Sequence, residues 1–251
     1  SHATQQKLVR EDLDRVMDRT DRILFAEDEV TTGKTIRNLI SVLEQRYGGG
    51  VKYAVASLLN GMTKEARKEF QDRGIELHCL QKISHEGYPE TASRVPEDGI
   101  YHGEEASGGE YTACFDLDGR VDARRYTEGF RYEAACRKFS EDILGLLPLE
   151  GYEKILVLGT EEFMYPGLCL GRDLEERGHA VAFHATTRSP IAVSRRADYP
   201  FHERYALSSF YQEDRRTFLY DVGSFDVVIV VTDAQEKGSR NVPAERSAEK
   251  E

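Results

Sequence analysis

The sequence has 251 residues, a length that suits one large α/β domain or two modest ones. Hydrophobic residues make up 39% and charged residues 31%, and no apolar run approaches the length of a membrane span, so we expect a water-soluble globular protein with no membrane partner. The formal net charge of −11 argues against nucleic acid as a partner, because that class of protein needs a basic surface.

The cysteine spacing and the first residues of the sequence indicate in which cellular compartment the protein is expected. Four cysteines are spread along the sequence without a CxxC pair, namely Cys79, Cys114, Cys136 and Cys169. This spacing indicates neither a zinc site nor a disulfide framework. No secretory signal peptide is visible, so a reducing cytoplasm is the expected location.

The first half of the chain alternates apolar strand patterns with helical patterns. The sequence predicts strands at 23–26, 53–59 and 75–83 and helices at 33–46 and 63–73. This alternation is typical of a parallel α/β sheet. After it, 84–109 is predicted to be mostly loop because apolar residues are few, and 128–147 has the periodicity of an amphipathic helix.

A loop rich in hydroxyl groups joins the first predicted strand to the first helix. The loop consists of Thr31, Thr32, Gly33, Lys34 and Thr35. It would present backbone N–H groups at a helix N-terminus, whose partial positive charge suits a phosphate. Glu27 and Asp28 stand directly after the apolar run, and as ionised acceptors they suit the two hydroxyls of a ribose, with Mg²⁺ nearby. Phosphate on the loop and sugar on the acids together indicate a phosphoribosyl group.

Two other interpretations apply to the same stretch. A nucleotide-hydrolase P-loop needs glycine at the position that Asp28 occupies, so the P-loop is excluded. The other interpretation is a strand-to-helix turn in which Thr31 or Thr32 caps the helix and the acids complement its dipole. Such a turn does not require two acids directly behind four apolar residues, and we favour the binding site.

The residues from Ile23 to Thr35 resemble the PRPP-binding signature of type I phosphoribosyltransferases, in which four mostly apolar residues, two acids and two variable residues precede Thr-Thr-Gly-Lys-Thr. The resemblance implies that Glu27 and Asp28 bind the ribose hydroxyls of PRPP, that the loop binds its 5′-phosphate, and that Mg²⁺ is the cofactor. Purine-salvage members often have Asp at the position of Thr31, so hypoxanthine or guanine is a less favoured acceptor.

Members of that family usually carry a pyrophosphate-binding loop and much of their sheet ahead of the signature, where this sequence has only residues 1–22. We therefore expect either a truncated or processed chain, or missing parts supplied by a homodimer or a partner chain. A further hypothesis is that 159–165, a turn entering a helix, supplies an equivalent anion site. Glu161 and Glu162 argue against direct pyrophosphate binding there unless Mg²⁺ bridges them.

A second α/β unit begins after Pro148. Strands are predicted at 154–159, 180–184 and 225–231, and a helix at 167–177. The expected division is a first domain at 1–148, a second at 149–234 and a disordered tail at 235–251. The expected fold class is α/β: a partial, Rossmann-like parallel sheet of the type I phosphoribosyltransferase kind, followed by a second α/β domain.

Polar residues follow each strand of the second half. If these strands are parallel, the polar sequences meet at one edge of the sheet and form a ligand crevice. Each sequence taken alone is also compatible with a capped turn, which we favour for Asp233, and Arg188 suits bidentate binding of a phosphate or carboxylate. The candidate residues of this second site are Gly159, Thr160, Glu161, Glu162, Tyr165, Thr186, Thr187, Arg188, Ser189 and Asp233.

The run Thr187-Arg188-Ser189-Pro190 resembles the motif that names the TRSP domain. That domain follows a phosphoribosyltransferase-like domain in proteins from bacterial tellurium-resistance gene clusters, and 159–165 and 220–233 are similar to it too. The resemblance implies synthesis of a ribonucleotide- or nucleoside-like small molecule in a stress-response pathway.

An aromatic-rich stretch at 199–220 is interleaved with arginines. Base stacking is one interpretation of it, and packing in the core or in a lid is the one that we favour. The histidines of the second half have no spacing that indicates a metal site.

The sequence thus predicts a phosphoribosyltransferase-like enzyme that displaces Mg²⁺-pyrophosphate from PRPP or catalyses the reverse reaction. Acids beneath the ribose and a fixed phosphate would stabilise the positive charge that develops at the anomeric carbon. No residue stands out in the sequence as a general base. Two alternatives stay open: a non-catalytic sensor of PRPP or a nucleotide, and a subunit whose active site another chain completes.

Overall fold

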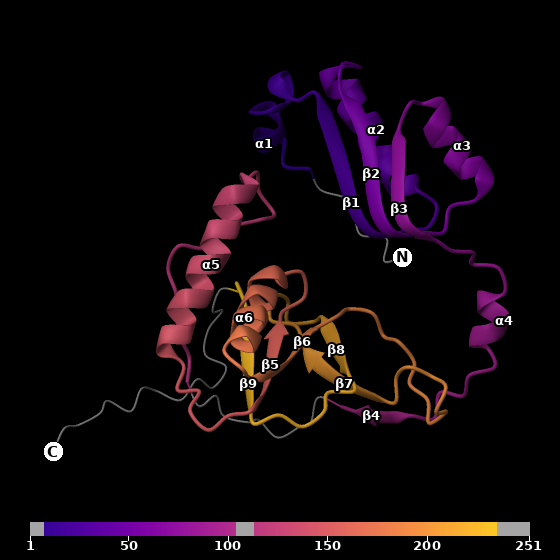
Figure 1. The fold of residues 1–251 in the computed structure, drawn as a ribbon. Helices are drawn as coiled ribbons and strands as arrows, with labels where there is room; N and C mark the ends of the chain where they lie inside the picture. The colour runs from indigo at the N-terminus through magenta and orange to yellow at the C-terminus, as the bar shows by residue number, and fades with distance from the viewer. Residues whose placement is uncertain (1–7, 104–112, 235–251) are drawn as a thin grey trace. The chain divides into compact units, whose positions relative to one another are not determined.

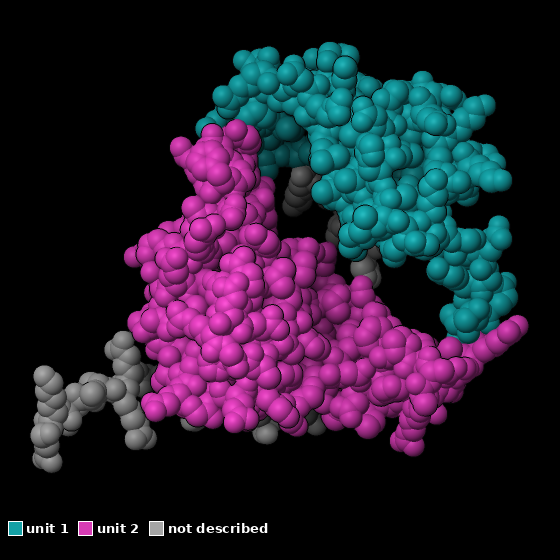
Figure 2. Space-filling view, viewed as in Figure 1, with its two compact units in different colours: residues 1–92 teal, residues 93–251 magenta. Residues whose placement is uncertain are grey.

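The computed structural model describes residues 8–103 and 113–234. The chain forms two compact units, residues 1–92 (unit 1) and residues 93–251 (unit 2), shown in Figures 1 and 2. The sequence predicts the boundary between the two domains at residue 148, whereas the boundary between the two units lies after residue 92. The long helix α5 (Gly129–Leu146) lies within unit 2, because its buried residues share a core with the strands that follow it. The tail expected at 235–251 lies outside the described residues.

Unit 1 is a three-stranded parallel sheet with helical crossovers (Figure 1). Its strands, in the order in which they pair, are β1 (Arg22–Val30), β2 (Lys52–Asn60) and β3 (Glu76–Lys82). The crossovers are α2 (Lys34–Tyr47) and α3 (Lys64–Asp72). Ile36, Ile40 and Leu43 recur on one side of α2 and are buried against β2 and α3. This is the alternation that the sequence predicts.

The first strand differs from its prediction in two ways. It continues to Val30, four residues past the apolar run, and it is not buried on both faces. Ile23 and Phe25 pack against the core beneath the helices, whereas Leu24, on the opposite face, is 58% exposed. The alternation arises because successive side chains of a strand point to opposite sides of the sheet.

The first sheet of unit 2 is also parallel, in the order β6-β5-β9. Its strands are β5 (Lys154–Gly159), β6 (Ala180–Ala185) and β9 (Val227–Val231). The central strand is almost fully apolar and buried, as expected for a parallel strand that is covered on both faces. The helix α6 (Tyr165–Glu176) packs against this sheet and against α5, and Leu170 and Leu174 are completely buried there.

A second, mixed sheet of unit 2 was not expected from the sequence. It consists of β4 (Ile100–His102), β7 (Glu203–Ser208) and β8 (Arg216–Tyr220), with β4 parallel and β8 antiparallel to β7. The described part of the stretch after residue 84 is mostly loop, as expected, but it also contains α4 (Tyr88–Ala92) and β4. The aromatic stretch supplies β7 and β8, and Phe218 and Tyr220 pack in a core, as the favoured interpretation predicts.

Short elements complete the described chain. Unit 1 begins with α1 (Arg10–Asp14) and the 3-10 helix η1 (Met17–Arg19). The Tyr47 hydroxyl at the end of α2 donates a 2.7 Å hydrogen bond to Asp14, which fixes α1 against α2. In the ranges that the structure describes, no helix combines the length and the hydropathy needed to cross a bilayer.

Candidate functional sites

The loop between β1 and α2 depends on the absence of a side chain at Gly33. This residue has a φ of 66°, in the left-handed region, and forms the N-cap of α2. A Cβ atom there would lie 2.7 Å from Cζ of Phe70 and 3.1 Å from Cε of Met62. Glycine is therefore required both by the backbone conformation and by the close approach of α3.

The rest of the loop is open to a ligand. Thr31, Thr32, Lys34 and Thr35 are all exposed. The Thr32 hydroxyl accepts a 3.3 Å hydrogen bond from the backbone N–H of Lys34, so it caps the first turn in part. The loop thus combines a helix N-terminus, an ammonium group and three hydroxyls at the carboxyl end of β1, an arrangement suited to an anion.

The two acids that the sequence placed after the strand lie within it. Because β1 extends to Val30, Glu27 and Asp28 point to opposite faces of the sheet. Glu27 is half-buried on the face that α2 covers, whereas Asp28 is exposed and accepts a 2.8 Å hydrogen bond from the N–H of Glu29. The two carboxylates therefore do not form one adjacent pair towards a single ligand.

Glu27 has surroundings that suit a ligand-binding carboxylate. Burial raises its pKa, and the charge of Asp28 raises it further. Its register partner on β2 is Ser57, a buried residue whose hydroxyl has no hydrogen-bond partner among the described residues. Register partners lie on the same face of a sheet, so an unsatisfied hydroxyl lies beside a carboxylate that is costly to bury.

A histidine lies at the same edge of the sheet. Nε2 of His85, shortly after β3, is 3.1 Å from Oε1 of Glu29, and each side chain is about one-third exposed, at 35% and 34%. The imidazole ring packs on Gly61, where a Cβ atom would lie 2.0 Å from Nε2. The carboxyl ends of all three strands thus contribute to one edge, and sequence reasoning missed His85 because no nearby motif marks it.

The described residues of this edge do not form a metal site by themselves, and Mg²⁺ stays a prediction. Among the residues that the structure describes, no group of three or more His, Cys, Asp or Glu side chains could hold a metal ion. Mg²⁺ commonly binds through one or two carboxylates together with substrate phosphates. Glu27 is the carboxylate placed to share such an ion.

In unit 2, the structure brings together the polar sequences that follow β5, β6 and β9. The three strands are parallel, so their carboxyl ends lie at one edge. The Thr160 hydroxyl donates a 2.9 Å hydrogen bond to Thr232, and the Thr186 hydroxyl accepts a 2.8 Å hydrogen bond from the N–H of Glu161. Thr160 and Thr186 are buried, so they fasten the three loops to one another.

Glu161 has the strained conformation of a residue fixed by its neighbours. Its φ is 48°, which is uncommon for a residue with a side chain. Its carboxylate is only 5% exposed, accepts a hydrogen bond from Ser209 and pairs with Arg215 at 2.8 Å. These contacts hold the loop after β5 against the turn between β7 and β8.

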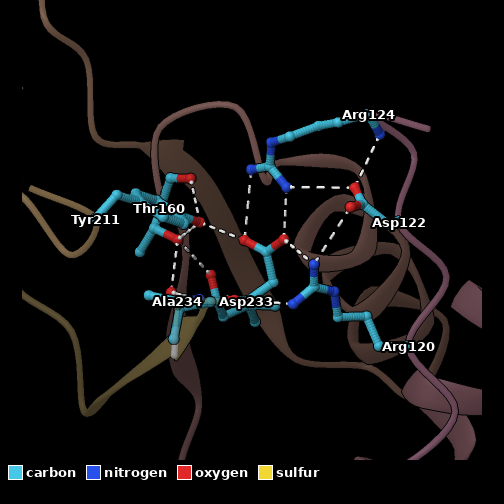
Figure 3. A network of polar contacts seen from close by, with 9 residues as sticks. Arg120, Asp122, Arg124, Thr160, Tyr211, Asp233 and Ala234 are labelled. Atoms are coloured by element: carbon cyan, nitrogen blue, oxygen red, sulfur yellow. Dashed lines mark hydrogen bonds and ion pairs between the residues drawn. The ribbon is translucent and has the colours of Figure 1, made fainter. Parts of the chain in front are cut away.

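Asp233 is the centre of a polar network at the same edge (Figure 3). Its side chain, 3% exposed, pairs with Arg124 at 2.6 Å and accepts a 2.6 Å hydrogen bond from Tyr211. Arg120 lies 3.8 Å from the same carboxylate. Burial opposes ionisation of Asp233, but the hydrogen bonds from Arg124 and Tyr211 outweigh it and lower the pKa. Asp233 therefore does not only cap a turn, because it also joins Arg124 and Tyr211.

The structure separates some predicted members of the second site from the rest. Thr187 forms backbone hydrogen bonds with Phe218, and the Ser189 carbonyl accepts one from Tyr220, so both residues connect the two sheets. Tyr165 lies at the start of α6, where its ring stacks on Tyr132. Arg188 pairs with Glu162 at 3.2 Å.

A cavity of about 400 Å³ opens beside the Asp233 network. Its wall consists of Arg120, Arg124, Glu161, Glu162, Phe210, Tyr211, Arg215, Asp233 and Ala234. Phe210, Tyr211 and Arg215 belong to the aromatic stretch for which base stacking was one interpretation, whereas sequence reasoning missed Arg120 and Arg124, in the segment before α5. Local pattern could not place either beside Asp233.

Two parallel α/β sheets, each with polar loops at its carboxyl edge, define a mixed α/β protein with a phosphoribosyltransferase-like, Rossmann-like sheet. A family model described as "Phosphoribosyl transferase" matches residues 1–85, and one described as "TRSP domain C terminus to PRTase_2" matches residues 124–244. The chain thus carries a region similar to a phosphoribosyl transferase domain, followed by a region similar to the TRSP domain, in that order. Comparisons with curated proteins and with solved structures gave no match.

Proposed function

We propose that unit 1 binds PRPP with Mg²⁺ and that the protein transfers the phosphoribosyl group to an acceptor, or catalyses the reverse reaction with pyrophosphate. One observation carries the proposal: the exposed Thr31–Thr35 loop lies at the N-terminus of α2, on the face of the sheet towards which Glu27 points. The match to a phosphoribosyl transferase family supports the reaction class.

The loop binds the 5′-phosphate in this account. Unpaired N–H groups in the first turn of α2 donate to the phosphate oxygens, and Lys34 adds a positive charge. Gly33 allows the backbone to turn into the helix at this point. Binding at a distance from the reacting carbon positions the sugar without taking part in the chemistry.

Glu27 binds the ribose. An ionised carboxylate accepts hydrogen bonds from neighbouring hydroxyls, and its negative charge stabilises the positive charge that develops at the anomeric carbon as pyrophosphate leaves. Because Asp28 points to the other face of β1, we assign it a smaller share of the affinity than Glu27. The Mg²⁺ that accompanies the diphosphate supplies charge neutralisation for the leaving group.

His85 is the residue to which we assign proton acceptance. Nε2 of His85 lies 3.1 Å from Oε1 of Glu29, so we assign the incoming proton to the other ring nitrogen, Nδ1. As the acceptor attacks the anomeric carbon, it loses a proton, and Nδ1 takes it while Glu29 stabilises the imidazolium that forms. Glu29 acts here as a positioning residue.

Release of pyrophosphate from Mg²⁺-PRPP, with a panel of acceptor bases or with water, tests the enzyme against a sensor that only binds. We expect release by the parent chain and a loss of about 10²-fold or more in kcat for His85→Gln, with little change in KM for PRPP. His78→Gln is the matched control, because His78 is an exposed histidine on β3. Binding without any release by the parent would favour the sensor, and an equal loss in both variants would exclude His85.

A tellurium-resistance pathway and a nucleoside-like product are proposals of a different kind. They rest on the TRSP match alone, since no described contact selects an acceptor base. The panel of acceptors in the same experiment addresses the product directly.

A further inference from the structure

The cavity of unit 2 has the size of a small-molecule site and a lining in which charged side chains predominate. Its volume of about 400 Å³ lies within the range found for such sites. Three arginines line it, and Phe210, which is 37% exposed, adds an aromatic surface. An aromatic ring that is partly open to a polar cavity offers a platform for a flat ligand ring.

The acids of the wall are already engaged by the protein. Glu161 pairs with Arg215 and accepts from Ser209, and Asp233 pairs with Arg124 and accepts from Tyr211. The sequence-based objection to an anion at this edge, the presence of two adjacent acids, is therefore removed for Glu161. Glu162 pairs with Arg188 at 3.2 Å, but its side chain is 66% exposed, so it keeps a negative charge at the mouth of the cavity.

The arginines, in contrast, have donors to spare. Each guanidinium carries five N–H groups. Among the described residues, Asp233 accepts from two nitrogens of Arg124, and two nitrogens of Arg215 donate to Glu161 and Gln212. Arg120 donates to the backbone carbonyl of Asp233 at 3.3 Å and has only longer contacts with carboxylates. Because buried carboxylates hold them, Arg124 and Arg215 lose little further side-chain entropy when a ligand binds. A wall with excess fixed donors needs a ligand rich in acceptors.

We propose that this cavity binds a phosphate ester that carries a flat ring, the chemistry of a nucleoside monophosphate. The phosphate binds the guanidinium groups of Arg120, Arg124 and Arg215, and the ring stacks on Phe210. This site lies wholly within unit 2 and is separate from the PRPP site of unit 1, so either assignment can fail without the other.

Calorimetric titration of the four common nucleoside 5′-monophosphates into the full chain tests the proposal. Arg120→Ala is the informative variant, because Arg124 and Tyr211 still hold Asp233 when it is made. We expect at least one nucleotide to bind, and Arg120→Ala and Phe210→Ala each to weaken that binding about tenfold. Arg137→Ala is the control, since Arg137 forms an exposed pair with Glu133 within α5 and its loss changes the charge equally.

Two further titrations distinguish this site from one that binds a sugar phosphate without a ring and from the PRPP site of unit 1. Ribose 5-phosphate, which lacks the ring, is expected to bind the unit 2 site at least tenfold more weakly than the best nucleotide. Glu27→Gln is expected to leave unchanged the part of nucleotide binding that Arg120→Ala weakens, whatever it does to nucleotide binding in unit 1. The proposal is overturned if no nucleotide binds the folded parent, or if Arg120→Ala and Phe210→Ala bind as well as Arg137→Ala. It is also overturned if Glu27→Gln, not Arg120→Ala, removes the binding, because the nucleotide then occupies unit 1.

Discussion

At the scale of single residues, Gly33 connects the stability of unit 1 with its proposed chemistry. The loop can turn into α2 only through a left-handed residue, and Phe70 leaves no room for a side chain at that turn. The same close packing holds the loop against α3. A ligand that binds the loop therefore meets backbone N–H groups already in position.

We predict that Gly33→Ala destabilises unit 1 by about 2–4 kcal/mol, through left-handed strain and overpacking against Phe70. Gly74→Ala is a close match, because Gly74 has nearly the same φ, 69° against 66°, with nothing within 4 Å of the added carbon. It should cost only the strain, about 1 kcal/mol. Urea denaturation measures both, and equal costs would show that the contact with Phe70 does not matter.

At Glu27, stability and proposed function conflict, because the negative charge that would bind the ribose destabilises the folded chain. Burial and Asp28 raise its pKa, so the folded chain binds this proton more tightly than the unfolded chain does. The ionised carboxylate therefore lowers stability above the raised pKa, and the effect disappears as the pH falls below the unfolded value. A residue kept in spite of such a cost is a candidate for function.

We therefore predict that Glu27→Gln raises the Tm of unit 1 at pH 7 by about 1–2 °C, and that the gain disappears towards pH 4. Thermal unfolding between these pH values measures it. The control is Glu76→Gln, at the start of β3, which should show no such pH-dependent gain. A lower Tm for Glu27→Gln throughout this range would mean that the carboxylate stabilises the fold.

At the scale of elements, the carboxyl edges of two parallel sheets hold both proposed sites. In unit 2 the edge is rigid, because buried hydroxyls join the loops after β5, β6 and β9. Asp233 lies at that edge, and its ionised form is held by Arg124 and Tyr211.

We predict that Asp233→Asn lowers the unfolding free energy of unit 2 by about 2–4 kcal/mol at pH 7. The pKa of Asp233 is lowered in the folded chain, so its contribution is complete above the unfolded value and is lost as the pH falls through the folded one. The difference in unfolding free energy between the parent and Asp233→Asn should therefore become smaller below about pH 4. Asp142→Asn, which breaks an exposed pair on α5, should cost less than about 1 kcal/mol. A gap that does not change with pH would contradict this account of Asp233.

The sequence was sufficient for the elements that hydrophobic periodicity marks and insufficient for those that depend on distant partners. The helix–strand alternation of unit 1 and the parallel strands of the first sheet of unit 2 follow from local pattern. β7 was missed because its residues are mostly half-buried, which leaves no clear hydrophobic alternation, and because it pairs with β4, about 100 residues earlier. β8 was missed with it, since β8 pairs with β7. Arg120 and Arg124 were missed for the same reason.

The end of β1 shows a second limit of the sequence. The sequence predicts that the strand ends with the apolar run at residue 26, directly before Glu27 and Asp28. The strand continues through them because only one face is covered and because β2 pairs with β1 as far as Asn60. Pairing with a neighbour outweighs the low strand propensity of the acids.

At the scale of the whole molecule, each unit has its own hydrophobic core and its own candidate site. The core of unit 1 is centred on Ile40 and Phe70, and that of the first sheet of unit 2 on Ile155 and Leu170. A variant in one unit therefore serves as a control for a ligand that binds the other. This separation makes the central proposal, a PRPP site in unit 1, directly testable.

The measurement that tests it most directly is calorimetric titration of PRPP with Mg²⁺ into the parent chain and into Glu27→Gln, Asp28→Asn, Glu76→Gln and Arg120→Ala. We predict that the parent binds, that Glu27→Gln loses about tenfold or more in affinity, and that Asp28→Asn loses less. Glu76→Gln and Arg120→Ala should bind like the parent. Failure of the folded parent to bind, or a loss confined to Arg120→Ala, would contradict a PRPP site on the loop between β1 and α2.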